Sequence, residues 1–214
     1  MRLRDKTREQ TKRQILEVAL ALFQEKGFRQ TTMRDIAEGA EIALGTTYNY
    51  FPTKESLALY FFEQALERVL ARHRRESPDG AALEEQLFLL VALELEEVEP
   101  YREFLNVVVT QAAAPSSPLH PFSVEVERLK RRQLDYVAGL VAAAIEHGEL
   151  PRLGFEGMLL SGFWIFHLGM VLYWLNDVSP NKEDTYVLLD RSLRFILGAL
   201  RQEGGELAPP PTIL

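Results

Sequence analysis

The segment GTTYNY, residues 45–50, lies between the apolar residues that precede it and Phe51. Its hydroxyl and carboxamide side chains can both donate and accept hydrogen bonds, and its glycine lets another molecule approach the backbone closely. Helix interiors usually avoid glycine, and soluble helices usually keep tyrosine half buried. The segment therefore forms either a loop rich in hydrogen-bonding groups or a short helix whose exposed face contacts a partner.

Residue types that support catalysis or metal binding are scattered along the chain. The 214 residues include no cysteine, which excludes disulfides and thiolate metal ligands and suits a reducing cytoplasm. None of the four histidines has a histidine or carboxylate four positions further on, the spacing of a helical zinc site. There is no glycine-rich phosphate loop and no Ser-His-Asp arrangement. We expect a cytoplasmic protein that is not an enzyme and uses no metal or cofactor.

The charges are distributed unevenly. The net charge is −7, but residues 1–75 contain 14 basic and 10 acidic side chains, whereas the remainder contains 10 basic and 21 acidic ones. This division indicates either a basic module joined to an acidic body or merely a solvated N-terminal helix. Charge alone does not separate the two interpretations.

Helical periodicity and end signals predict four helices in the first 76 residues. The first is amphipathic and ends before Gly27, which supplies a left-handed residue. Thr32 and Asp35 form a capping-box pattern that opens a short helix. After a tight turn, a second short helix at 44–49 ends before Pro52, because proline excludes its neighbour from the α region. A long helix then runs to about residue 76.

Helix-breaking residues divide the rest of the chain into five helices, expected at residues 81–98, 101–113, 122–147, 155–176 and 181–203. No segment alternates in the manner of a strand. The tail from residue 204 contains three consecutive prolines and is expected to be disordered. The sequence thus predicts an all-α protein of about nine helices, with a head (1–55), a body (56–203) and a tail (204–214).

Two short helices joined by a tight turn, with a stabilising helix before them, have the layout of a helix-turn-helix DNA reader. In this layout Gly45 admits DNA close to the backbone, the threonines suit base edges, and Tyr48 and Tyr50 reach phosphates. Lys54 pairs with phosphate, and Thr32 places a helix N-terminus near one. The alternative is that both tyrosines are core aromatics. The residues expected to bind DNA are Thr32, Arg34, Leu44, Gly45, Thr46, Thr47, Tyr48, Asn49, Tyr50 and Lys54.

The same stretch resembles the DNA-binding domain of the TetR family of transcriptional repressors, over about the first quarter of the chain. The resemblance is carried by Gly27, Phe28, Thr32, Ile36-Ala37, Ala40, Ile42, Gly45-Thr46, Tyr48, Tyr50-Phe51 and Lys54 to Leu57. It implies a homodimer whose first three or four helices bind the major groove of a palindromic double-stranded operator. It also implies that a small effector bound in the body spreads the two heads and releases the DNA.

Departures from the family pattern affect the turn and the second short helix. Glu41 stands where relatives usually have glycine, so it is strained if that position needs a positive φ. Ala43 stands where they usually have serine, which forfeits a side-chain cap worth about 1 kcal/mol. Leu44 stands where they often have lysine. These differences leave the fold expectation unchanged but predict fewer phosphate contacts and prevent transfer of an operator sequence.

Candidate residues for effector binding lie in the body. Aromatic side chains are dense between residues 163 and 174, in a helix that is uncharged apart from one histidine. A neutral histidine donates one hydrogen bond and accepts another, which would orient a ligand. The alternative is that these residues are core or dimer packing. The candidates are Arg102, Asn106, Phe163, Trp164, His167 and Tyr173, and their apolar character predicts a hydrophobic or amphipathic effector.

Residues 158–175, MLLSGFWIFHLGMVLYWL, contain no formal charge and meet the lower length limit for a membrane span. No lysine or arginine clusters at either end, which favours a buried helix of a soluble protein, packed between a core and a partner subunit. We therefore expect no membrane partner and a homodimer built by residues 155–176 and 181–203. The alternative is a membrane-associated helical protein or a small helical enzyme that uses this segment.

Overall fold

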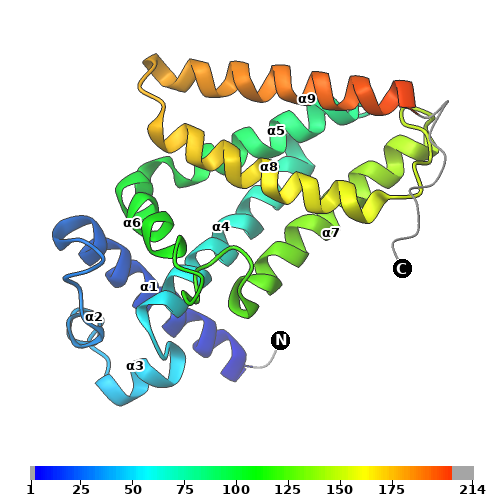
Figure 1. Cartoon of the computed structure of the whole chain (residues 1–214). Coiled ribbons are helices and arrows are strands. Elements are labelled where there is room, and N and C mark those ends of the chain that lie inside the picture. The colour runs from blue at the N-terminus through cyan, green and yellow to red at the C-terminus, as the bar shows by residue number, and fades with distance from the viewer. Residues whose placement is uncertain (1–2, 204–214) are drawn as a thin grey trace, which may run out of the picture. The chain divides into compact units, whose positions relative to one another are not determined.

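The structure is a computed structural model that describes residues 3–203, so the predicted tail from residue 204 lies outside the described residues. The described residues form nine α-helices and two 3-10 helices, without a strand (Figure 1). This confirms the all-α prediction. The helices are α1 (Leu3–Lys26), α2 (Met33–Gly39), α3 (Leu44–Tyr50), α4 (Lys54–Glu76), α5 (Leu83–Val98), η1 (Glu99–Tyr101), α6 (Arg102–Ala112), α7 (Val124–Glu146), α8 (Glu156–Asn176), η2 (Pro180–Lys182) and α9 (Glu183–Glu203).

The helix ends follow the local signals in the sequence. Gly27, directly after α1, has φ 83°, which a residue with a side chain rarely adopts. Before α4, Thr53 and Ser56 cap each other: the Ser56 N–H donates to Thr53 Oγ1 at 3.1 Å and the Thr53 N–H donates to Ser56 Oγ at 3.2 Å. The five helices predicted after residue 80 correspond one to one to α5–α9.

The chain divides into two compact units. The first contains Met1–Ala65 and Val98–Leu129, and the second contains Leu66–Glu97 and Lys130–Leu214. The sequence predicted a boundary at residue 55, whereas the first unit extends further and also takes in α6. The physical reason is an aromatic cluster: the ring of Phe104 on α6 lies 5.1 Å from that of Phe23 and 5.7 Å from those of Phe28 and Phe61. Such pairs bind α6 to α1 and α4 more strongly than apolar burial alone would.

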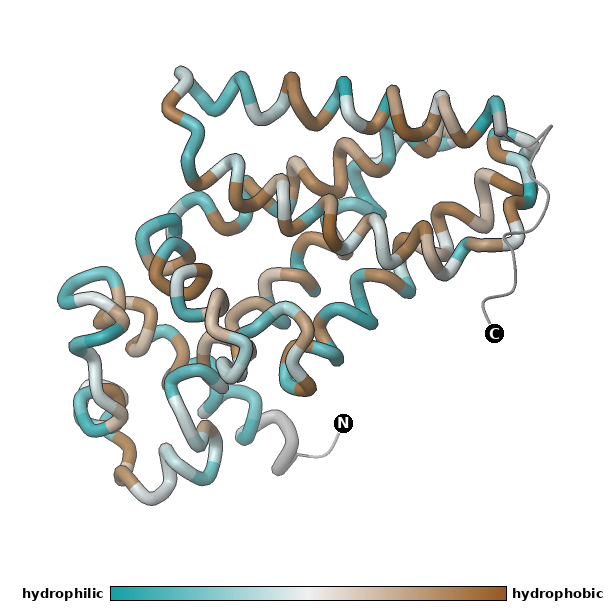
Figure 2. Tube along the Cα trace, in the orientation of Figure 1, coloured by the Kyte–Doolittle hydropathy of each residue, from teal (hydrophilic) through white to brown (hydrophobic). Residues whose placement is uncertain are grey.

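Within the second unit, α8 and α9 pack against each other (Figure 1). The helix α9 buries Leu189, Leu193 and Leu197 on one face, while Phe195 on the other is 78% exposed. Figure 2 shows the corresponding alternation of apolar and polar segments along α9.

The helix α8 is apolar on all sides but is covered by this chain on one side only. Trp164, Met170 and Trp174 are buried, whereas Ile165 and Leu172 are exposed. Among the described helices, α8 alone is long and apolar enough to cross a membrane, and 28% of its most apolar stretch is buried. This is weak support for a span, because core helices of soluble proteins can have the same length and composition. The predicted burial of this helix is therefore met on one face only, and its other face is exposed in the single chain.

Candidate DNA-binding and effector sites

A capping box holds the N-terminus of α2. The Asp35 N–H donates to Thr32 Oγ1 at 3.1 Å, and the Thr32 N–H donates to Asp35 Oδ2 at 2.7 Å. Lys26 Nζ also lies 2.9 Å from Asp35 Oδ2. The hydrogen bond from Lys26, followed by those from Thr32, lowers the pKa of Asp35 to about 2. The predicted cap is confirmed, and both Thr32 and Arg34 are exposed beside it.

The turn between α2 and α3 contains one left-handed residue. Glu41 has φ 55°, in the region that favours glycine, so the condition under which the sequence predicts strain at this position is met. The turn is closed by the Ile42 N–H, which donates to the Ala37 carbonyl at 2.9 Å. The side chain of Gln14 on α1 donates to the Ala40 carbonyl at 2.9 Å. These bonds fix the angle at which α3 leaves α2, and they tie that angle to α1.

The helix α3 presents a polar, exposed face. Its N-cap residue Ala43 makes no side-chain cap, as predicted. The exposed residues are Gly45, Thr46, Asn49 and Tyr48, the last to 46%. A β-carbon at Gly45 would have nothing within 4 Å, so the packing of this chain does not require glycine there. Since glycine in a helix costs about 1 kcal/mol relative to alanine, its presence favours close approach of another molecule.

Thr47 does not belong to the exposed face of α3. Its side chain is fully buried, and its Oγ1 donates to the Ala43 carbonyl at 3.3 Å. Successive helical residues differ by about 100° around the axis, so the neighbour of an exposed residue can point into the core. The prediction that Thr47 contacts DNA is therefore wrong for this structure, and its role is packing.

Three other predicted DNA-binding residues are partly buried in the first unit. Leu44 and Tyr50 pack against its hydrophobic core, which matches the alternative of a core aromatic for Tyr50 but not for Tyr48. Lys54 Nζ donates to the Phe28 carbonyl at 2.7 Å and lies 4.8 Å from the Phe28 ring centroid. Lys54 thus ties the start of α4 to the segment before α2, and a phosphate contact by Lys54 would compete with this tie.

In the second unit, two of the predicted effector residues belong to a polar cluster. His167 Nε2 lies 2.7 Å from Glu94 Oε2, and Gln133 Nε2 donates to Glu94 Oε1 at 2.8 Å. The rings of Trp164 and His167 lie 5.9 Å apart, and the Phe163 ring is stacked 6.4 Å from that of His167. We define Glu94, Gln133, Trp164 and His167 as the polar cluster. It draws one residue from α5, one from α7 and two from α8.

Glu94 and Gln133 were not predicted. A sequence signal for Glu94 does exist: it follows Leu83, Leu87 and Leu90 at helical spacing, so a carboxylate occupies a position on the buried face of α5. For Gln133, which is only 3% exposed, we find no comparable signal, because a glutamine in the charged stretch LKRRQLD is expected to be solvated.

The six predicted effector residues are divided between the two units. Phe163, Trp164 and His167 lie together on α8. Tyr173 is 43% exposed and belongs to the outer face of that helix. Arg102 and Asn106 lie on α6, in the first unit, where Asn106 is exposed. Which of the six contact an effector stays a prediction.

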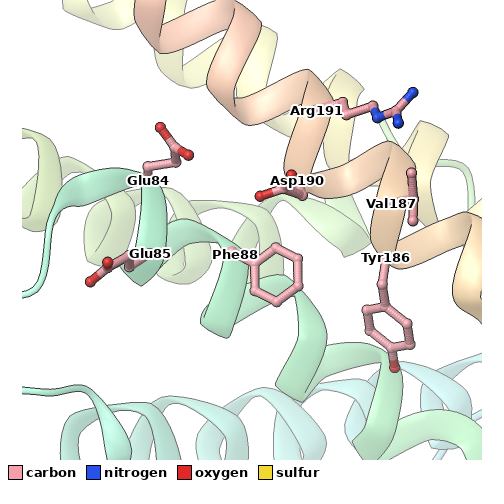
Figure 3. Close-up of a pocket in the computed structure, with 7 residues that line it drawn as sticks. All are labelled: Glu84, Glu85, Phe88, Tyr186, Val187, Asp190 and Arg191. Atoms are coloured by element: carbon pink, nitrogen blue, oxygen red, sulfur yellow. The ribbon is translucent and has the colours of Figure 1, made fainter.

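An open groove of about 550 Å³ lies between α5 and α9 of the second unit (Figure 3). It is lined by Glu84, Glu85, Phe88, Tyr186, Val187, Asp190 and Arg191. The ring centroids of Phe88 and Tyr186 are 6.4 Å apart. The three carboxylates of this groove make it unlike the apolar pocket that the sequence predicts.

Among the residues that the structure describes, no group of three or more His, Cys, Asp or Glu side chains is arranged to hold a metal ion.

A helix pair joined by a tight turn, braced by α1 and exposing the polar face of α3, defines a helix-turn-helix protein of the DNA-binding class. Comparison with known families agrees with this class. Residues 15–61 match "Bacterial regulatory proteins, tetR family", and residues 86–207 match "Tetracyclin repressor-like, C-terminal domain". The chain belongs to the tetR family of bacterial regulatory proteins.

Curated relatives match over part or most of their length. The transcriptional repressor KstR2 of Mycobacterium tuberculosis is 31% identical over 135 residues, 63% of this chain and 66% of that protein. The repressor KstR of Mycolicibacterium smegmatis is 27% identical over 200 residues, 91% of this chain and 90% of that protein. For the uncharacterized regulator YuxN of Bacillus subtilis the values are 28% over 122 residues, 55% of this chain and 38% of that protein. The chain thus spans less than two thirds of two of these relatives.

Solved structures share the fold. The FadR repressor of Thermus thermophilus in complex with lauroyl-CoA has a TM-score of 0.69 at 24% identity, over 95% of this chain and 99% of that chain. FadR of Bacillus subtilis in complex with stearoyl-CoA has a TM-score of 0.58 at 22% identity, over 86% of this chain and 96% of that chain.

Proposed function

We propose that this protein is a transcriptional repressor that binds a palindromic operator and releases it when a small apolar or amphipathic effector binds its second unit. The observation that carries the proposal is the exposed polar face of α3, where Gly45 has no packing reason within the chain. The exposure of Thr46, Tyr48 and Asn49 on α3 supports the proposal, because helix-turn-helix proteins insert the exposed face of their second helix into the major groove. The repressor names of KstR2 and KstR support repression as the direction of control.

The repressor acts as a homodimer in this proposal. A palindromic operator requires two heads related by two-fold symmetry, and one chain supplies one head. The outer faces of α8 and α9 carry the exposed apolar side chains Met158, Ile165, Leu172, Tyr173, Val187, Leu188, Phe195 and Ile196. Monomers seldom expose a large apolar patch, so a second copy is the proposed occupant of these faces. In such a dimer the apolar faces are covered by protein and not by a membrane. Regulators of this family are generally cytoplasmic.

The effector is proposed to have a long apolar part. Phe163 and Trp164 offer aromatic surface in the second unit, and pockets for small molecules are mostly apolar with a few polar groups. Lauroyl-CoA and stearoyl-CoA, named for two structures of the same fold, are the first effectors to test. Binding of effector and operator is coupled reciprocally, so each weakens the other by the same factor, typically about 5–150-fold. No catalytic step enters this mechanism.

A gel-shift experiment with DNA from beside the protein's own coding region tests the proposal. The full chain is expected to form a discrete complex that unlabelled DNA of the same sequence competes away and scrambled DNA does not. The variant Thr46→Ala/Tyr48→Ala/Asn49→Ala is expected to lose this complex. It alters exposed side chains only, so it should keep the helical circular-dichroism spectrum of the wild type. Equal affinity of wild type and this variant for the DNA would show that α3 does not read it.

A further inference from the structure

The polar cluster contains buried atoms that lack a hydrogen-bond partner. Trp164 Nε1, His167 Nδ1 and Glu94 Oε2 are buried and form no hydrogen bond with any described residue. His167 Nε2 lies 2.7 Å from Glu94 Oε2, so the imidazole faces the carboxylate with this nitrogen. Buried polar groups in native proteins are nearly always paired, so unpaired buried atoms in one cluster require a physical explanation.

The unpaired atoms differ in what they need. The indole N–H of Trp164 is a donor only, and a carboxylate oxygen of Glu94 is an acceptor only. The neutral imidazole of His167 carries one donor and one acceptor nitrogen. A single ligand group that pairs with Trp164 and also with either Glu94 or His167 must therefore accept a hydrogen bond from the indole N–H and donate one to the carboxylate or the imidazole. A hydroxyl does both, whereas a carbonyl, an ether or a carboxylate only accepts.

The charge of the cluster restricts the ligand further. Glu94 contacts Gln133 and His167, and no lysine or arginine of the described residues pairs with it. A second carboxylate placed beside it in a buried, weakly polarisable environment would be repelled, because charge interactions are stronger there than in water. The cluster thus favours an uncharged polar group over an anionic one.

Three features make the polar cluster suitable for binding. Trp164 and Gln133 are 4% and 3% exposed, so their polar atoms are fixed by packing. The side chains of His167 and Glu94 are 13% and 11% exposed, so the cluster reaches solvent at one edge. Phe163, stacked near His167, supplies apolar surface next to the polar atoms.

We propose that the polar cluster of Glu94, Gln133, Trp164 and His167 is a binding site for the hydroxyl group of an otherwise apolar, uncharged molecule. The hydroxyl oxygen accepts the hydrogen bond of Trp164 Nε1–H and donates its proton to Glu94 Oε2 or His167 Nδ1. This inference rests on the proposed function, since it names the polar end of the effector that releases the operator.

The test compares three probes with the same ten-carbon chain, 1-decanol, decyl methyl ether and decanoate, on the full-length protein. Isothermal titration calorimetry should show decanol binding at least about tenfold more tightly than the ether or the carboxylate, the loss typical of one unpaired buried group. Trp164→Phe removes the donor but keeps an aromatic ring, and should weaken decanol about tenfold. The matched control Trp174→Phe is the same change on the same helix, outside the polar cluster, and should leave decanol affinity unchanged.

A second measurement on wild type covers the case in which a variant fails to fold. The chain has two tryptophans, so a nitrogen-15 spectrum contains two indole N–H signals. Decanol should shift the Trp164 signal. This signal is the one missing from the spectrum of Trp164→Phe or, if that variant does not fold, the one retained in Trp174→Phe. Equal binding of the three probes, or an unmoved Trp164 signal at saturating decanol, would overturn the inference. If decanol binds wild type and Trp164→Phe equally while the operator complex still forms, the repressor proposal stands and the hydroxyl site falls.

Discussion

At the residue scale, exposure separates side chains of the same type. Thr46 and Thr47 are adjacent in α3, but Thr46 is exposed and Thr47 is fully buried with its hydroxyl bonded to the Ala43 carbonyl. The same division applies to Tyr48, which is exposed, and Tyr50, which packs against the core. Neighbouring residues of one type therefore have different roles, and single substitutions can distinguish them.

We expect Thr46→Ala to change which bases the protein prefers, because a good base contact is worth about 1–3 kcal/mol. Thr47→Ala should leave base preference unchanged and lower the free energy of unfolding by about 1 kcal/mol, through the lost methyl group and hydrogen bond. Affinities for an operator panel with single-base changes, together with urea unfolding, measure both effects. A changed base preference in Thr47→Ala would contradict the assignment of that side chain to the core.

Tyr48→Phe should weaken operator binding by a similar factor for all sequences, because a phenol hydroxyl that reaches phosphate carries no base information. One such hydrogen bond is worth about 0.5–1.5 kcal/mol. Fluorescence-anisotropy titrations with specific and unrelated duplexes measure it. Tyr50→Phe, on the half-buried side, is the matched control and should change affinity less than Tyr48→Phe does.

The carboxyl group of Asp35 predicts a pH effect at the start of α2. Its pKa falls from 3.8 to about 2 in the folded protein, because Lys26 and Thr32 bond the ionised form. Folding therefore favours the ionised carboxylate, and this stabilisation is complete above the unfolded pKa and is lost as the pH falls towards about 2. Asp35→Asn should lower stability relative to wild type at pH 7, with the difference shrinking below pH about 4. A difference that is constant from pH 7 to pH 2.5 would exclude this origin.

At the element scale, the turn between α2 and α3 is held in place by contacts that compensate for poor local residues. Glu41 adopts a positive φ that glycine would adopt without strain, and Ala43 gives α3 no side-chain cap. The Gln14 bond to the turn and the Ile42 bond to Ala37 supply compensating contacts. The turn is therefore less stable than it would be with glycine at position 41 and a capping side chain at position 43.

Glu41→Gly should raise the free energy of unfolding by about 1 kcal/mol, because left-handed geometry costs a residue with a side chain about 1–2 kcal/mol and glycine loses part of that gain in entropy. Glu38→Gly, an exposed position inside α2, should instead lower it by about 1 kcal/mol. Urea unfolding monitored by circular dichroism measures both variants. A destabilised Glu41→Gly would mean that the turn does not carry the strain that its φ indicates.

At the scale of the whole molecule, the outer faces of α8 and α9 determine the proposed assembly. Phe195 is 78% exposed on α9, and Ile165 is 61% exposed on α8. Gly162 and Gly169 on α8 have open space where a β-carbon would lie, so a partner helix could approach closely there. These features favour a second copy of this chain as the partner that covers the apolar surface.

Phe195→Glu should convert the dimer to a monomer, since it places a charge in the proposed apolar interface. Val124→Glu introduces the same charge at another apolar side chain, 88% exposed and outside α8 and α9, and should leave the assembly unchanged. Sedimentation velocity at micromolar concentration distinguishes the two states, and operator binding should be lost together with the dimer. A wild-type monomer under these conditions would contradict the proposed assembly.

Local interactions explain what could be predicted from the sequence. Helix ends depend on residues a few positions apart, so the ends at Gly27 and at the capping box of Thr32 were predicted correctly, and Glu41 was recognised as a strained residue if its φ were positive. The exposed face of α3 followed from the same local pattern, except at Thr47, where one residue's rotation about the helix axis decides burial. These features need no knowledge of distant neighbours.

Contacts between residues far apart in the chain were decided by the tertiary structure alone. The aromatic contacts of Phe104 bring α6 into the first unit, which no boundary signal in the sequence indicates. The polar cluster joins Glu94, Gln133 and His167 across three helices, and its unpaired atoms exist only because packing buries them together. Periodicity states which side of a helix is apolar, but it does not state which other helix that side meets, because many pairings bury similar area.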